Sequence, residues 1–200
     1  MFALDDKRVL RRYRRVTDVT GEAKVMSYVA ELGYPVPAVF EAQGSDLVLE
    51  RLDGPTMAQA LAAGDIGVRA GADMLANLLQ TLHELPTWPG AEQQIVHLDL
   101  HPENVMLTGR GPVVIDWCNA RDGAADLDTA LSAVIVAQVA ADGEHPWSAA
   151  AGEFLTAFLA VAPGAPVRLL DDAVAFRGWQ LDLTDLDALA PAKALIRDAR

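Results

Sequence analysis

The sequence has one cysteine, little positive charge and no long apolar run. Cys118 is the only cysteine among 200 residues, so no internal disulfide can form, and this favours a reducing compartment. Lys and Arg number 16 against 28 Asp and Glu, and a net charge of −12 argues against nucleic acid as the main partner. The run over residues 130–141 is interrupted by Ser132 and Gln138 and is too short to cross a bilayer. Since the first ten residues (MFALDDKRVL) also lack the apolar core of a signal peptide, we expect a cytoplasmic protein with no membrane partner.

Length and hydrophobic content are sufficient for a sizeable core. The chain has 52% hydrophobic residues, which suits one domain with two lobes or two small domains. The pattern predicts an α+β protein, with a strand-rich part over residues 1–54 and a mainly helical part over residues 55–200. Thr56 is expected to cap a short helix that ends at Ala63, and Asp65 to cap a long one. Further helices are predicted over residues 125–141, 147–161, 168–181 and 185–198.

The most informative stretch runs from His97 to Gly123 and reads HLDLHPENVMLTGRGPVVIDWCNARDG. It contains His-x-Asp-x-x-x-x-Asn, followed by a β-branched run that ends in an aspartate. Asp99, Asn104 and Asp116 are the side chains that a phosphoryl-transfer site needs. One carboxylate orients the attacking hydroxyl and accepts its proton, and oxygen ligands hold Mg²⁺ on the phosphates. Magnesium prefers oxygen donors, so Asn104 and Asp116 suit that second role.

The predicted local structure would bring these side chains together. Ile95 and Val96 are predicted to form a short strand, and residues 104–107 and 112–116 form two strands around a glycine-containing turn. Such a hairpin places Asn104 at the start of one strand and Asp116 at the end of the next, with Asp99 on the loop leading in. A polar turn before a buried hairpin would explain a lone His-x-Asp. The full pattern has four constrained positions and a correctly placed apolar run, which favours the functional interpretation.

The sequences HLDLHPENVML and VVIDWCNARDG resemble the aminoglycoside phosphotransferase and choline kinase family, the small-molecule branch of the protein-kinase-like fold. The resemblance implies a two-lobe fold that uses ATP or another NTP with Mg²⁺ to phosphorylate a hydroxyl of a small molecule (aminoglycoside-, choline- or homoserine-like). It implies that Asp99 is the catalytic base and that His97 supports its loop. It also implies that Asn104 and Asp116 are the magnesium ligands and that Asp128 braces the site.

The resemblance extends towards the N-terminus. Residues 8–15 look like the strand that carries a phosphate-binding cation, and Glu22 opens the helix that would carry its carboxylate partner. Arg11 is the first choice for the cation and Arg12 the alternative, because neighbouring strand residues face opposite sides and the register is open. Glu50 and Leu52 lie on the expected hinge, where the family binds adenine through backbone groups.

Two departures from the family pattern keep alternatives open. The family uses Lys more often than Arg at the phosphate-binding position, and only seven residues precede Arg8, which leaves no room for the glycine-rich hairpin. Either the chain is a shortened version, or it is a reduced member that binds nucleotide weakly or not at all. A non-catalytic kinase-like binding module is therefore the main alternative. A small protein kinase is less favoured, because Asp116 is followed by Trp117 and Cys118 and no Ala-Pro-Glu segment follows. The acceptor and the oligomeric state are not determined by the sequence.

Overall fold

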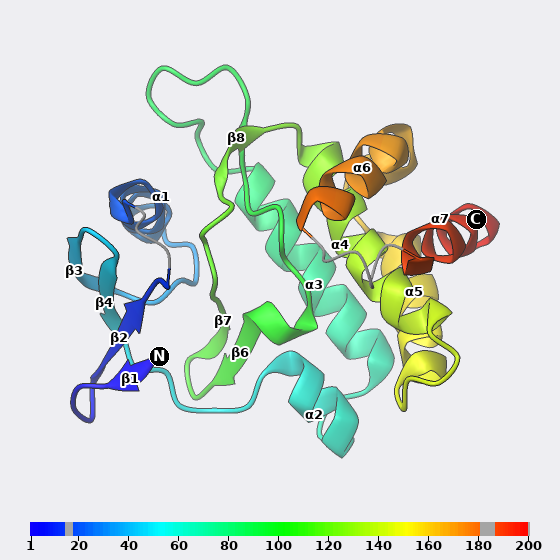
Figure 1. Cartoon of the computed structure of the whole chain (residues 1–200), viewed down its shortest axis with the longest axis horizontal. Helices are drawn as coiled ribbons and strands as arrows, with labels where there is room; N and C mark the ends of the chain where they lie inside the picture. Colours follow the sequence, from blue (N-terminus) through cyan, green and yellow to red (C-terminus); the bar gives the residue numbers. More distant parts are fainter. Residues whose placement is uncertain (15–17, 181–186, 200) are drawn as a thin grey trace.

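The computed structural model describes residues 1–14, 18–180 and 187–199. Its N-terminal part is a four-stranded antiparallel sheet in the order β1-β2-β4-β3, with helix α1 beside it (Figure 1). The elements of this part are β1 (Phe2–Ala3), β2 (Arg8–Arg12), α1 (Thr20–Glu31), β3 (Val39–Gln43) and β4 (Asp46–Glu50). Met26 and Val29 of α1 and Leu47 of β4 are buried, so the helix and the sheet share one apolar layer.

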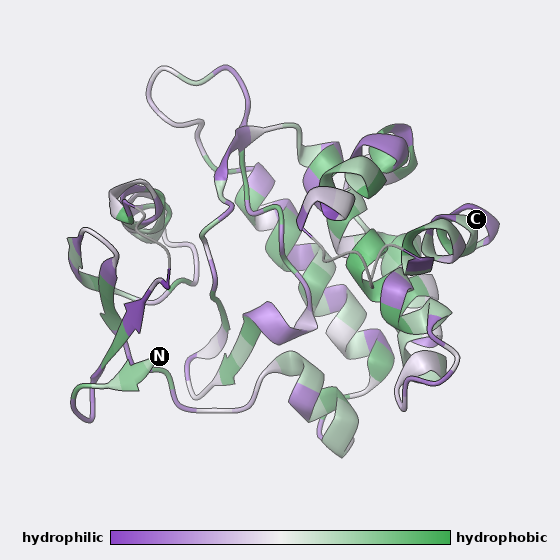
Figure 2. Cartoon of the chain, in the orientation of Figure 1, coloured by the Kyte–Doolittle hydropathy of each residue, from purple (hydrophilic) through white to green (hydrophobic). Residues whose placement is uncertain are grey.

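The C-terminal part is a helical bundle around α4 (Figure 1). Its helices are α2 (Met57–Ala63), α3 (Val68–His83), α4 (Ala125–Ala141), α5 (Ser148–Val161), α6 (Leu170–Gln180) and α7 (Leu189–Asp198). A run of ten consecutive α4 residues, 128–137, is buried, as expected for a helix that contacts neighbours on every side (Figure 2). Within the described part of the chain, no single helix is long and apolar enough to cross a membrane. The bent pair 148–161 and 166–180 passes that test jointly, by length and composition alone.

Two short strand pairs lie between the sheet and the bundle. Strand β5 (Gln94–Val96) pairs with β8 (Arg121–Gly123), and β6 (Val105–Thr108) pairs with β7 (Gly111–Val114). A 3₁₀ turn, η1 (Pro102–Asn104), leads into β6. The predicted strand at Ile95 and Val96 and the predicted hairpin are both present. Strand β8 was not predicted, because Arg121, Asp122 and Gly123 show no apolar alternation.

The helix starts confirm one predicted cap and correct another. Thr56 caps α2 through a capping box, in which its side chain accepts from the Gln59 backbone N–H and the Gln59 side chain accepts in return. Asp65 does not cap α3. Its backbone N–H donates to the Ala60 oxygen and so belongs to the end of α2, while α3 begins after Gly67 without a side-chain cap.

The two parts are joined tightly at Gly54, in the segment between β4 and α2 where the boundary at residues 54 and 55 was predicted. Gly54 has φ +138°, and a Cβ there would overlap the carbonyl of Leu107 in β6. The Leu107 N–H donates to the Pro55 oxygen at 2.8 Å, and Arg110 in the β6–β7 turn forms an ion pair with Glu50 of β4 at 2.8 Å. Only glycine fits this backbone conformation and close approach.

Candidate active site

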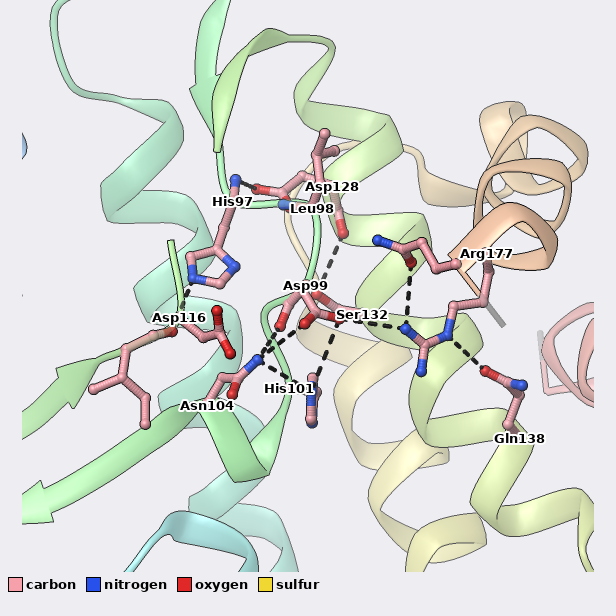
Figure 3. Close-up of polar contacts among 12 residues, drawn as sticks. His97, Leu98, Asp99, His101, Asn104, Asp116, Asp128, Ser132, Gln138 and Arg177 are labelled. Carbon is pink, nitrogen blue, oxygen red and sulfur yellow. Dashed lines mark hydrogen bonds and ion pairs between the residues drawn. The ribbon is translucent and has the colours of Figure 1, made fainter. Parts of the chain in front are cut away.

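The loop of residues 97–104 begins with a backbone conformation that a buried carboxylate holds in place. Leu98 has φ +62°, a region that L-residues rarely adopt. Asp128 of α4 accepts the backbone N–H groups of His97 at 2.9 Å and of Leu98 at 2.6 Å (Figure 3). Asp128 and His97 are fully buried, so one side chain satisfies two donors that water cannot reach.

Asp128 is ionised. Burial alone would raise its pKa, but the hydrogen bond with His83 Nε2 at 2.9 Å and the nearby His83 and His97 rings outweigh burial, and the pKa of Asp128 is lowered. Asp128 was expected to open the following helix and to brace the site. It lies in the first turn of α4.

His97 lies behind the loop rather than in the open site. Its Nε2 is 3.1 Å from the Ile115 carbonyl oxygen, and its ring contacts the Trp117 ring edge-on at 4.9 Å between centroids. Burial lowers the pKa of His97, so the ring is neutral near pH 7. Its contacts link the 97–104 loop to the segment that carries Asp116.

Asp99 lies at the centre of the site, between Asn104 and Arg177 (Figure 3). Asn104 Nδ2 donates to the Asp99 backbone oxygen at 2.8 Å and to Asp99 Oδ2 at 3.3 Å. Arg177 Nη1 is 3.4 Å from Asp99 Oδ1. Burial raises the pKa of Asp99 to about 6, although the charge of Arg177 acts in the opposite direction. A carboxyl group that titrates near this value can take up a proton at neutral pH.

Asn104 and Asp116 lie side by side because the β6–β7 register brings them together. Val105 pairs with Val114, so the residues just before β6 and just after β7 share one end of the hairpin. Asp116 has φ +64°, a second left-handed residue of the site. Burial would raise the pKa of Asp116, but Arg11 at 2.6 Å outweighs burial and the pKa is lowered. Its carboxylate is therefore ionised.

The register of the N-terminal sheet selects Arg11 over Arg12. Arg11 is half-buried and reaches both Asp116, at 2.6 Å, and Glu22 of α1, at 3.4 Å. Arg12 turns to the opposite, exposed face, where it forms a bidentate ion pair with Asp46 of β4. The predicted contact between Arg11 and Glu22 is thus present, and of these two arginines it is Arg11 that lies in the site.

Tyr13 belongs to this cluster and was not anticipated from the sequence. Its hydroxyl donates to Glu22 Oε2 at 2.6 Å, and its ring lies 4.7 Å from the Arg11 guanidinium carbon. Burial raises the pKa of Glu22, although the Tyr13 hydrogen bond and the Arg11 charge oppose it. Tyr13 follows Arg11 by two positions on an extended segment. Strand periodicity therefore predicts that both side chains lie on the same face.

Arg177 is the second residue that sequence reasoning missed. It lies on α6, 78 residues from Asp99, and its Nε donates to Gln138 Oε1 of α4 at 3.0 Å. Gln138 and Arg177 therefore connect the C-terminal helices to the 97–104 loop. No motif marks either residue, and only the packing of α6 on α4 brings them to Asp99.

Glu50 and Leu52 lie at the end of β4 and just beyond it. The Glu50 backbone N–H donates to the Ala38 oxygen at 2.8 Å, and its carboxylate accepts from Ala38 N–H at 3.1 Å and from Arg110 at 2.8 Å. The Arg51 N–H donates to the Lys7 oxygen. The Glu50 side chain thus fastens the sheet to the β6–β7 turn.

Comparisons with known proteins agree with this arrangement. Residues 75–169 match the family described as the phosphotransferase enzyme family (APH). No curated protein sequence matches the chain significantly. Solved structures with a similar fold include three kinases. The complex of amicoumacin kinase hAmiN with AMP-PNP, Ca²⁺ and Ami is 15% identical, with a TM-score of 0.57 over 99% of this chain and 87% of that one.

The other two are aminoglycoside phosphotransferases. The aminoglycoside-3'-phosphotransferase of type VIII is 19% identical, with a TM-score of 0.53 over 96% of this chain and 84% of that one. The gentamicin complex of APH(2'')-IIa is 12% identical, with a TM-score of 0.58 over 96% and 88%. At these identities the similarity shows the protein-kinase-like fold. The residues 75–169 that match the phosphotransferase enzyme family include the 97–104 loop, the β6–β7 hairpin and Asp128 of that fold.

Proposed function

We propose that this protein transfers the γ-phosphate of ATP, or of another NTP, to a hydroxyl group of a small molecule. The observation that carries the proposal is the meeting of Asp99 and Asn104, from the 97–104 loop, with Asp116, which follows β7, beside the half-buried cation Arg11. Similar structures named for AMP-PNP and gentamicin complexes support a nucleotide and a small-molecule acceptor. No nucleic-acid or membrane partner is proposed, and the cytoplasmic location stays a prediction.

Asp99 is the proposed catalytic base. The acceptor oxygen forms a bond to the γ-phosphorus while the bond from that phosphorus to the β–γ bridging oxygen breaks, so the nucleoside diphosphate leaves. The proton of the acceptor hydroxyl passes to the Asp99 carboxylate. Asn104 fixes this carboxylate by donating to both its side-chain and its backbone oxygen, so Asp99 need not reorganise when the hydroxyl arrives.

Asn104 and Asp116 are the proposed ligands of Mg²⁺, and their donor set fits that ion. Because Asn104 Nδ2 donates to Asp99, its amide oxygen is the atom left for a cation, and Asp116 adds an ionised carboxylate. Among the described residues no group of three or more His, Cys, Asp or Glu side chains could hold a metal alone, so the phosphates would complete the coordination. Bound there, Mg²⁺ would neutralise charge on the phosphates.

Arg11, Glu22, Glu50 and Leu52 are the proposed nucleotide contacts. Arg11 would bind the phosphates, and Glu22 would hold its guanidinium as it does in this structure. On the hinge, the backbone N–H of Glu50 already donates within the sheet. The adenine contact is therefore assigned to the Glu50 carbonyl and the Leu52 backbone.

A second candidate function is nucleotide or ligand binding without transfer. The Arg11 guanidinium forms a direct ion pair with Asp116 at 2.6 Å, so the proposed metal ligand is already neutralised by a cation of the chain. In addition, the described strands β1 and β2 are joined by residues 4–7, which contain no glycine. Both features favour a site that holds phosphates less firmly than one covered by a glycine-rich loop does.

One experiment separates the two. Nucleotide affinity is measured by calorimetry with and without Mg²⁺, and transfer is measured with labelled ATP and a panel of amines, sugars and antibiotics. Transferase function predicts that Asp99→Asn loses roughly 10²- to 10⁴-fold in transfer rate and keeps its nucleotide affinity. It also predicts that Asp116→Asn loses the magnesium dependence of binding. Equal transfer by wild type and Asp99→Asn would reject Asp99 as the base, and nucleotide binding without any transfer would favour the second candidate.

A further inference from the structure

Glu22 of α1 contacts Arg11 through one of its two carboxylate oxygens. Arg11 Nη1 lies 3.4 Å from Glu22 Oε1, while Arg11 Nη2 donates to Asp116 Oδ1 at 2.6 Å. The other oxygen, Glu22 Oε2, accepts from the Tyr13 hydroxyl at 2.6 Å. The guanidinium therefore gives one terminal nitrogen to α1 and directs the other at the proposed metal ligand.

The neighbouring arginine shows what happens when both oxygens of a carboxylate contact one guanidinium. Arg12 Nε donates to Asp46 Oδ1 at 2.7 Å, and Arg12 Nη2 donates to Asp46 Oδ2 at 2.5 Å. Such a two-point contact is a common and strong geometry between arginine and a carboxylate. It occupies two nitrogens of the guanidinium, and a phosphate would have to compete for them.

Tyr13 is placed so that Glu22 does not form this contact with Arg11. Its backbone N–H donates to the Ser45 oxygen at 3.0 Å, and its ring lies 4.7 Å from the guanidinium carbon of Arg11. The Glu22 side chain is only 6% exposed, so water can replace the hydroxyl only poorly. Burial raises the pKa of Glu22, and the Tyr13 hydrogen bond opposes this rise more strongly than the Arg11 charge does. Of these two contacts to the carboxylate, the one from Tyr13 is thus the shorter and the stronger.

We propose that Tyr13 is a positioning residue for the phosphate-binding arginine. By occupying Glu22 Oε2, its hydroxyl limits Glu22 to one contact with Arg11 and leaves Arg11 Nη2 for the phosphates. This inference rests on the proposed function, in that it assumes that Arg11 binds the phosphates of a nucleotide. Without the hydroxyl, Glu22 can pair with Arg11 through both oxygens, and the phosphates lose a donor.

The test removes the hydroxyl and keeps the ring. Binding of ATP and of adenosine is measured by calorimetry in the presence of Mg²⁺, for wild type and for Tyr13→Phe. The affinity for ATP should fall at least about tenfold, because a hydrogen bond between charged groups is weakened. The affinity for adenosine should stay unchanged, because adenosine has no phosphate to contact Arg11. A merely structural role of Tyr13 would lower both affinities.

Tyr28 provides the matched control. It lies on α1, and its hydroxyl donates to the backbone oxygens of Thr87 and Pro86 rather than to Glu22. Tyr28→Phe removes the same atom and should bind ATP and adenosine as wild type does.

A second variant tests the same step from the side of the carboxylate. Glutamine has a single acceptor oxygen, so Glu22→Gln cannot form the two-point contact with Arg11. Addition of Tyr13→Phe to Glu22→Gln should therefore change the affinity for ATP by less than about twofold, against at least about tenfold in the wild-type background.

The outcomes separate the inference from the proposed function. Equal affinity of wild type and Tyr13→Phe for ATP, an equal loss in Tyr28→Phe, a parallel loss of adenosine binding, or the full loss in the Glu22→Gln background would overturn the inference while leaving phosphotransferase activity intact. The expected binding pattern without transfer of phosphate from labelled ATP to any acceptor would support the positioning role and reject the proposed function. Absence of ATP binding by wild type would overturn both.

Discussion

Replacement of Asp128 by asparagine tests how the 97–104 loop is held. Asp128 Oδ1 accepts the Leu98 N–H at 2.6 Å, and Oδ2 accepts the His97 N–H at 2.9 Å and lies 2.9 Å from His83 Nε2. An asparagine has one oxygen, so in either orientation at least one buried backbone N–H would face an amide N–H. The fold of the loop depends on this carboxylate because Leu98 is held at a positive φ.

The expected loss follows from these contacts. A hydrogen bond to a charged group contributes about 1.5–3 kcal/mol, and Asp128→Asn weakens or removes about two of them, so we expect a loss of about 3–5 kcal/mol in the free energy of unfolding. The measurement is urea denaturation followed by circular dichroism. A loss of this size is a large fraction of the roughly 5–15 kcal/mol typical of a domain.

The matched control is Asp171→Asn on α6. Asp171 forms ion pairs with Lys193 at 2.6 Å and with Arg197 at 3.3 Å, but its side chain is 71% exposed, so the same change should lower the free energy of unfolding far less than Asp128→Asn does. The pH dependence has a definite sign. The folded pKa of Asp128 is lowered, so its contribution is present above the ordinary aspartate pKa and is lost as pH falls through the folded value. Equal destabilisation by the two substitutions would refute the bracing role of Asp128.

Three further predictions concern nucleotide binding, the hinge and pH. Arg11→Ala should weaken magnesium-nucleotide binding at least about tenfold, because a charge-assisted phosphate contact is lost, while Arg12→Ala should have little effect; calorimetry showing the reverse order would assign the phosphate to the other strand face. Gly54→Ala should lower the unfolding free energy by about 2–4 kcal/mol, against about 1 kcal/mol for Gly33→Ala, where a Cβ meets open space. Because Asp99 must be ionised to accept a proton and its pKa is raised to about 6, kcat/KM should fall as pH decreases through that value; a profile that stays flat to about pH 4 would contradict this role.

The parts of the fold with local sequence signals were predicted well. The buried helix α4 has the predicted bounds, 125–141, because its apolar run is longer than a typical strand. The β6–β7 hairpin follows from its glycines and β-branched residues. The start of α3 was missed because Asp65 is a good capping residue by type but is already used at the end of α2. Residues 185 and 186 of the predicted helix 185–198 and residue 181 of the predicted helix 168–181 lie outside the described residues, and the described helix α7 begins at Leu189.

Among the site residues, too, those with a local sequence signal could be predicted and those placed by long-range packing could not. Asp99, Asn104 and Asp116 could be found because their spacing is short and the chemistry restricts their types. The choice of Arg11 over Arg12 required the sheet register, which depends on the pairing of β2 with β4. Arg177 and Gln138 could not be found, because their contact with the loop arises from helix packing between residues far apart in the chain.

The charges of the site imply a link between nucleotide and metal binding. Arg11 neutralises Asp116 in this structure, with Glu22 on its other side. On the proposed function, Arg11 must turn from Asp116 to the phosphates, which leaves the Asp116 carboxylate uncompensated unless a divalent cation is bound at the same time. Each of the two ligands should therefore raise the affinity for the other, since both favour the state in which this ion pair is open. In Arg11→Ala no ion pair has to open, so this part of the coupling should disappear together with the contact to the phosphates.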